Sequence, residues 1–211
     1  VMAVEQLMRE TGIGVEIPEY AEYVRVICGE LNRIASHLIS MGTYGLDMGA
    51  FTPFLHAIRE REVILNIFEK ICGARLMYSY YDVGGVKWDI PDDALDEIKA
   101  FCDFFPKKLQ EYHTLLSTNE IFIGRTANVG IITPSDAHDY GCTGPVLRGS
   151  GVKFDCRKDD PYSLYHNFDF DIPVGMGEMG TVGDCWDRYI VRVREIEQSC
   201  RIIRQALESL P

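Results

Sequence analysis

The sequence predicts a mainly α protein, built as a bundle of long helices with a loop-rich, partly extended insert. Apolar residues recur three and four positions apart over several long stretches, which is the period of a helix with one buried face. Proline, aspartate and glycine stand at the ends of these stretches. Residues 119–183 lack this period and are rich in Gly, Pro, Asp and aromatic side chains.

The first half of the chain predicts three helices. A short one covers about residues 1–11. The second follows Pro18, a favoured first-turn residue, and should run over 18–42 with a stripe of Val24, Ile27, Leu31, Ile34 and Leu38. The third should run over 53–73, from Pro53 to Gly73, with a face of Phe54, Ile58, Leu65, Phe68 and Cys72.

Two further helices are predicted over 91–117 and 184–210. Pro106 lies inside the first of them and should kink or divide it. The second should begin at a cap formed by Asp184 or Asp187. Its stripe is Val193, Ile196, Cys200, Ile203 and Leu207.

The insert over 119–183 predicts ordered loops, and a long ordered connection is usually functional or an interface. Within it, residues 168–172 alternate like a short strand. Val1 falls within a helical pattern and Pro211 directly follows one. We therefore expect residues 1–211 to be a single internal fragment of a longer helical domain.

The composition excludes several function classes. Of the 211 residues, 46% are hydrophobic, enough for a real core. The formal net charge of −11 argues against nucleic-acid binding, which needs Lys and Arg to neutralise phosphates. No apolar run approaches the roughly 20 residues of a transmembrane helix, and no signal peptide is visible, so a cytoplasmic location is expected.

Seven cysteines lie at wide, irregular spacings without a Cys-x-x-Cys pair. Zinc ribbons, iron–sulfur loops and thioredoxin-type centres therefore lack their signature. We expect reduced, mostly buried thiols in a reducing compartment.

Several polar motifs have an ordinary structural interpretation beside a functional one. Asp47 lies between two apolar helices, and its ordinary interpretation is a helix cap or a solvated turn, because a buried carboxylate would need a partner. Residues 59–62 (Arg-Glu-Arg-Glu) read as a solvated helix face. The five histidines are expected at the surface, with His37 on the polar side of its helix beside Glu30 and Arg33.

Gly149-Ser150-Gly151 lacks the full phosphate-binding fingerprint, so nucleotide binding is not predicted. No nucleophile–base pair, carboxylate pair or metal cluster stands out from spacing alone.

Four strings taken together resemble one family: residues 30–38 (ELNRIASHL), 42–54 (GTYGLDMGAFTPF), 144–153 (GPVLRGSGVK) and 183–189 (GDCWDRY). With 59–62 and 72–75 between them, they are similar, in order and over the whole chain, to the D subunit of respiratory complex I. That family is related to the large subunit of nickel–iron hydrogenases, and the resemblance implies a bundle of that type.

The resemblance implies a peripheral subunit of a NADH:quinone oxidoreductase, on the cytoplasmic side of the membrane. Such a complex passes electrons from NADH through iron–sulfur clusters to quinone, and NAD and the clusters belong to other subunits. The D subunit binds no metal and forms one wall of the quinone cavity beside the terminal cluster of the B subunit. The implied partners are the B and C subunits, the membrane-arm subunits of the quinone channel, and quinone. The fragment alone is not expected to be catalytic.

By resemblance, Asp47 matches an acid that hydrogen-bonds a histidine of the quinone-binding hairpin, and would be the catalytic residue. Thr43, Phe54 and Leu55 match positions that line the quinone cavity. The family's quinone-contacting histidine and tyrosine have no counterpart in this sequence. Met77 stands where many relatives have a histidine tied to the pH dependence of the terminal cluster, and this difference leads to the hypothesis of a menaquinone-type system.

The sequence leaves three alternatives open. A nickel–iron hydrogenase large subunit needs two Cys-x-x-Cys pairs, which this sequence lacks. A relative driven by a reduced deazaflavin or by ferredoxin uses the same subunit. A non-catalytic scaffold module is the third. In each case we expect exposed apolar surface where partners pack, and self-association of the isolated chain.

Overall fold

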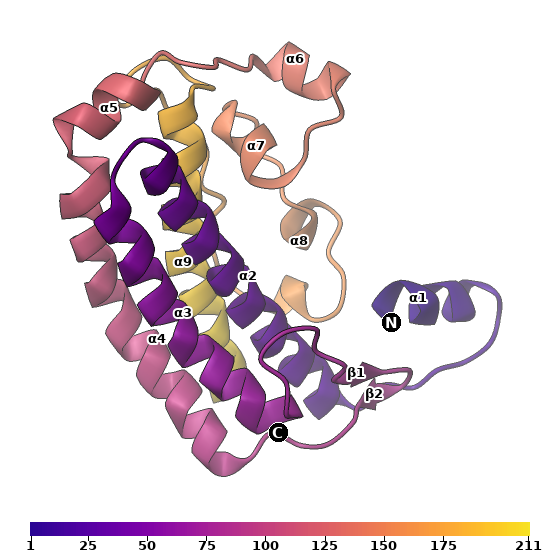
Figure 1. The fold of residues 1–211 in the computed structure, drawn as a ribbon. Coiled ribbons are helices and arrows are strands. Elements are labelled where there is room, and N and C mark those ends of the chain that lie inside the picture. Colours follow the sequence, from indigo (N-terminus) through magenta and orange to yellow (C-terminus); the bar gives the residue numbers. More distant parts are fainter.

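The computed structural model describes all residues from 1 to 211 and is mainly α-helical. Four long helices form a bundle: α2 (Glu19–Asp47), α3 (Phe51–Cys72), α4 (Asp92–Tyr112) and α9 (Cys185–Glu208). Figure 1 shows them side by side, with the short helices of the insert at one end of the bundle and along one side of it. The predicted fold class is confirmed.

Helix α2 is the central element, since it packs against both α3 and α9. All five residues of its predicted apolar stripe are fully buried. The helix follows Pro18, as expected, but it ends at Asp47 instead of Gly42. Asp47 therefore lies in the last helical turn and not in a loop.

Helix α3 begins at Phe51, slightly before the expected start, and ends against Gly73. Gly73 has φ +70°, the left-handed conformation that commonly stops a helix and that glycine adopts without strain. Where α3 crosses α2, an added Cβ on Gly42 would lie 3.0 Å from the Cβ of Ala57. This close approach lets the two helices pack tightly just below their connection.

Pro106 was expected to kink or divide its helix, and it does not divide it, because α4 runs through it from Asp92 to Tyr112. A π-helical turn, η1 (His113–Ser117), then completes the predicted segment. The side chains of Phe101, Phe105 and Leu109 are buried on either side of the proline. Tertiary packing of this apolar face outweighs the loss of one backbone donor.

Helix α9 starts where predicted, and Asp184 is confirmed as its cap, accepting a hydrogen bond from the backbone N–H of Asp187. The stripe residues Val193, Ile196, Cys200 and Ile203 are fully buried.

The insert contains α5 (Glu120–Thr126), α6 (Pro134–Asp139), α7 (Gly144–Gly149), α8 (Cys156–Asp159) and the 3-10 turn η2 (Tyr165–Asn167). The strand expected over 168–172 is wrong, because this extended run pairs with no other strand. Instead, the backbone N–H groups of Asp169 and Asp171 donate to the side chains of Gln205 and Gln198 on α9. The only strands are β1 (Tyr81–Asp82) and β2 (Gly85–Val86), a short antiparallel pair.

Helix α1 (Met2–Glu10) lies apart from the bundle in Figure 1. It is fixed by a buried ion pair, in which Arg25 of α2 donates two hydrogen bonds of 2.8 Å to Glu5. Gly84, between the two strands, also donates to Glu5. None of the helices is both long and apolar enough to span a membrane.

Candidate functional site

The connection between α2 and α3 contains the residues that sequence resemblance points to. The chain reverses over Met48, Gly49 and Ala50, and the N–H of Ala50 donates back to the carbonyl of Gly45. Gly49 makes the reversal possible with φ +88°, a conformation that side chains rarely adopt. We refer to residues 43–55 as the α2–α3 corner.

The structure places the four predicted residues on two neighbouring helix ends. Thr43 and Asp47 lie four residues apart at the end of α2, hence on one face. Asp47 is exposed, and its carboxylate has no hydrogen-bond or ion-pair partner in this chain. Thr43 is half-buried, and its hydroxyl donates to the carbonyls of Ile39 and Ser40 in its own helix.

On the α3 side of the corner two large apolar side chains are exposed. Phe54 is half-buried, with its ring centroid 6.2 Å from that of Phe51. Leu55 is 51% exposed and Phe51 is 57% exposed, and the two lie four residues apart on one face of α3. The corner thus presents one unpaired carboxylate at the end of α2 and exposed apolar side chains at the start of α3.

Two cavities of the chain lie away from the corner. One of about 680 Å³ lies between α1 and the insert, with Glu22, Arg25 and His166 in its lining. The other, about 490 Å³, is lined largely by aromatic side chains of residues 68–81 together with Cys28 and Asn32 of α2. Neither cavity includes any of the four predicted residues.

One residue at the corner was missed by sequence reasoning. The Nη1 atom of Arg125, on α5, donates a 2.6 Å hydrogen bond to the carbonyl of Met48. Figure 1 shows α5 at the same end of the bundle as the α2–α3 connection. Because 77 residues separate the two partners, no local spacing could indicate the contact.

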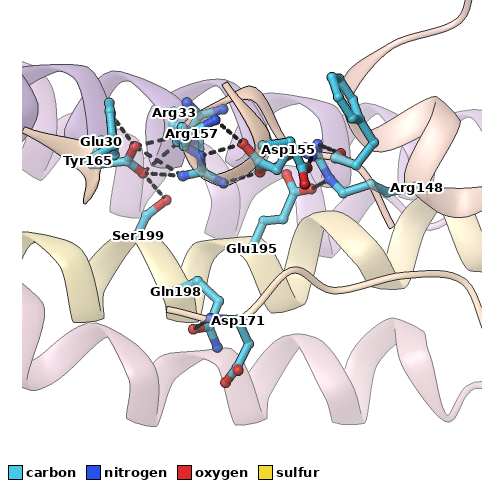
Figure 2. Close-up of polar contacts among 12 residues, drawn as sticks. Glu30, Arg33, Arg148, Asp155, Arg157, Tyr165, Asp171, Glu195, Gln198 and Ser199 are labelled. Carbon is cyan, nitrogen blue, oxygen red and sulfur yellow. Dashed lines mark hydrogen bonds and ion pairs between the residues drawn. The ribbon is translucent and has the colours of Figure 1, made fainter. Parts of the chain in front are cut away.

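A second group of polar residues is buried between α2, α9 and the insert (Figure 2). At its centre Glu30 of α2 is fully buried and accepts from four side chains. Arg157 donates to both carboxylate oxygens of Glu30 at 3.1 Å, and Nε of Arg33 donates to one of them at 3.2 Å. The hydroxyls of Tyr165 and Ser199 each donate at 2.6 Å. Both oxygens of Glu30 are therefore fully engaged.

The same group continues along α9 to Glu195, also fully buried. Its two oxygens lie 2.6 Å from Nε of Arg148 and 2.6 Å from Nε2 of His37. Asp155 joins the two halves, since it accepts at 2.7 Å from Arg157 and lies 3.4 Å from Arg148. We call these residues the buried ion cluster.

The charges within the cluster balance when His37 is neutral. Three carboxylates face three guanidinium groups: Glu30, Asp155 and Glu195 against Arg33, Arg148 and Arg157. Burial acts to raise the pKa of Glu30, but Arg33 and Arg157 outweigh it and hold the pKa below the usual value. For Glu195, burial is likewise outweighed by His37 and Arg148, and its pKa is lowered. Both carboxylates are thus ionised, which suits their cationic partners.

The prediction that His37 lies at the surface is wrong, as only 7% of it is exposed. Its neighbour Glu30 is also buried, so the polar side of α2 is not a solvated face. The reason is that the insert covers this side and supplies the matching arginines. A similar correction applies to residues 59–62, where Glu60 is only 3% exposed and pairs with Arg59.

The string of residues 183–189 forms a second structural feature that spacing left unexplained. Asp184 accepts from the N–H groups of Asn128 and Thr181, and Asp187 accepts from those of Gly177 and Gly183. Two buried carboxylates thereby hold the glycine-rich loop against the start of α9. Burial raises the pKa of Asp187, and the backbone donors only partly offset it.

The seven cysteines are all free thiols. Three are buried, three are half-buried and Cys156 is exposed, so the expectation of mostly buried thiols holds only for Cys28, Cys102 and Cys200. No group of three or more His, Cys, Asp or Glu side chains could hold a metal ion.

Comparison with known proteins gives a consistent result. Residues 47–211 match the family described as respiratory-chain NADH dehydrogenase, 49 Kd subunit. The chain is 50% identical over 208 residues to a D subunit of the NADH-quinone oxidoreductase of Sorangium cellulosum, covering 99% of this chain and 52% of that protein. It is 52% identical over 202 residues to the D subunit of the NADH-quinone oxidoreductase of Bacillus thuringiensis, covering 96% of this chain and 54% of that one. The chain thus spans about half the length of these relatives.

Proposed function

Because this chain belongs to the family of the respiratory-chain NADH dehydrogenase 49 Kd subunit, we propose that it forms one wall of a quinone-reduction cavity in a NADH:quinone oxidoreductase. The relatives carry quinone in their names, which supports this choice of substrate. In this proposal the terminal iron–sulfur cluster belongs to a neighbouring B subunit, and NAD is bound elsewhere in the complex.

The observation that carries the proposal is that one corner of the bundle exposes both the carboxylate of Asp47, at the end of α2, and the apolar side chains of Phe51 and Leu55, at the start of α3. An exposed apolar surface with one convergent polar group suits a ligand whose body is apolar and whose reactive headgroup is polar. Thr43, Phe54 and Leu55 would contribute to the wall of that cavity. The rest of the cavity would come from chain segments and subunits that pack over the corner.

In this role Asp47 would hydrogen-bond a histidine supplied by another segment, and the pair would deliver a proton to the reduced quinone. A carboxylate and an imidazole together can hold and pass a proton near neutral pH. Because its partner histidine is not in this sequence, the chain alone would be inactive.

The proposed partners are the B and C subunits and the membrane-arm subunits of the quinone channel, with the chain peripheral on the cytoplasmic side. Large apolar side chains available for such contacts are exposed on several elements, including Met77 at 95%, Ile121 at 67% and Met176 at 65%.

The test replaces Asp47 by Asn in the intact complex and measures quinone reduction. We expect the rate to fall by about 10²-fold or more, since Asn keeps the shape but cannot carry the proton. The matched control is Asp139→Asn, another exposed aspartate at the end of a helix, which should leave the rate unchanged. Full activity of Asp47→Asn would instead indicate that the corner serves only as a scaffold.

A further inference from the structure

The end of helix α2 carries an electrostatic conflict. The last turn of this 29-residue helix contains no basic residue, and it contains Asp47. The C-terminal end of a helix carries a partial negative charge, because its last carbonyls have no partner within the helix. A second negative charge placed there is disfavoured unless a cation lies nearby.

Arg125 supplies that cation from another part of the chain. Its Nη1 atom donates to the carbonyl of Met48, the residue directly after Asp47. An added Cβ on Gly49 would lie 3.3 Å from the same nitrogen, so the guanidinium packs directly against the backbone of the chain reversal. The single hydrogen bond therefore both satisfies an end carbonyl of α2 and places a positive charge at its negative end.

Helix α5 is well suited to hold Arg125 in place. Asn119 caps its start by accepting from two backbone N–H groups. Phe122 is 2% exposed, and its ring lies 4.9 Å from that of the buried Tyr189 on α9. The buried Thr126 closes the helix with a hydroxyl bond to the carbonyl of Phe122. Arg125 thus projects from an element whose other face is anchored in the core.

We propose that Arg125 is a positioning residue for Asp47, fixing the last turn of α2 and compensating its charge. This inference rests on the proposed function, in which the Asp47 carboxylate must meet a quinone headgroup and a histidine at fixed distances. Small displacements of a reacting group cost rate, and sites built on braced elements avoid them. Arg125 itself is not proposed to touch quinone.

The experiment uses the intact complex with Arg125→Ala, Arg125→Lys, Asp47→Asn and the double variant Arg125→Ala/Asp47→Asn. We expect Arg125→Ala to lower kcat for quinone reduction about tenfold, with a smaller change in KM, because the acid is misplaced while the apolar wall remains. Lysine keeps the charge near the helix end and should restore most of the rate. The control is Arg201→Ala, which removes a partly exposed arginine paired with two exposed aspartates and should leave kcat unchanged.

The double variant decides whether Arg125 acts through Asp47. If it does, removing Arg125 from an Asp47→Asn complex costs nothing more, and the double variant is as slow as Asp47→Asn alone. A double variant slowed by the product of the two single effects would overturn the inference, as would an Arg125→Ala complex of unchanged kcat.

The two proposals can fail separately. If Asp47→Asn slows quinone reduction but the Arg125 variants reduce quinone at the normal rate, the proposed function stands and only the positioning role of Arg125 is contradicted. A fully active Asp47→Asn complex removes both. If Arg125→Ala prevents assembly, Arg125→Lys and Arg125→Gln still decide: the inference requires lysine to be markedly faster than glutamine, and equal rates contradict it.

Discussion

The imidazole Nε2 of His37 lies 2.6 Å from a carboxylate oxygen of Glu195, and both side chains are buried between α2 and α9. Burial is the main cause that lowers the pKa of His37, and Arg33 and Arg192 act in the same direction. The Glu195 carboxylate opposes this shift but does not overcome it. His37 is thus a neutral donor to an ionised acceptor.

This pair predicts a pH-dependent stability. In the unfolded chain His37 takes up a proton near pH 6.5, whereas the folded chain resists protonation until a lower pH. The unfolded state therefore binds more protons, and the free energy of unfolding should fall as pH drops below about 6.5. Urea unfolding of the chain between pH 7.5 and 5 measures this loss.

The control for this prediction is His37→Gln, which can still donate to Glu195 but does not titrate. Its stability should be flat over the same pH interval. A further loss at lower pH, as Glu30, Asp155 and Glu195 become protonated, should remain in both proteins, since their pKa values are all lowered in the fold. An equal slope above pH 5 in wild type and variant would contradict the assignment.

The buried ion cluster should respond strongly to loss of one charge. Glu30→Gln leaves Arg157 and Arg33 without their shared carboxylate, and we expect destabilisation of about 3–5 kcal/mol. The comparison is Glu178→Gln, which breaks a partly exposed pair with Arg194 and should cost about 0–1 kcal/mol. Denaturant midpoints of the two variants test this, and similar shifts would argue against a specific role of burial.

Gly49 should not tolerate a side chain. At φ +88°, with Arg125 at 3.3 Å from an added Cβ, Gly49→Ala should cost about 1–2 kcal/mol. Gly124, inside α5, has open space around it, and Gly124→Ala should be stabilising by roughly 0.5–1 kcal/mol. Thermal unfolding distinguishes the two, and a neutral Gly49→Ala would show that the reversal adapts.

Met77 offers a test of the proposed link between this chain and the terminal iron–sulfur cluster of a B subunit. It is 95% exposed with φ +57°, a left-handed conformation in which histidine is better represented than most side chains. In the intact complex, Met77→His should make the reduction potential of that cluster depend on pH, because imidazole titrates and a thioether does not. Redox titration at several pH values measures this, with Met77→Gln as the non-titrating control. A pH-independent reduction potential in Met77→His would contradict the proposal that the residue at position 77 is coupled to the cluster.

The sequence by itself determined the long helices and the family. The stripe of α2 from Val24 to Leu38 is a local property, because residues three and four apart share a helix face whatever the rest of the chain does. The same holds for the Asp184 cap, whose donor lies three residues away. The string of residues 42–54 resembles the family closely enough to indicate the corner around Asp47 as a candidate site.

Only the tertiary structure decided which polar residues are buried. Glu30 and Arg157 are 127 residues apart, and Arg125 and Met48 are 77 apart. A polar helix face has the same sequence pattern whether water or a folded insert covers it. The sequence therefore predicts solvated side chains for Glu30 and His37. In the fold the insert covers both of them and supplies its arginines. A buried charge is stable only beside a partner, and here the chain delivers that partner from far away in the sequence.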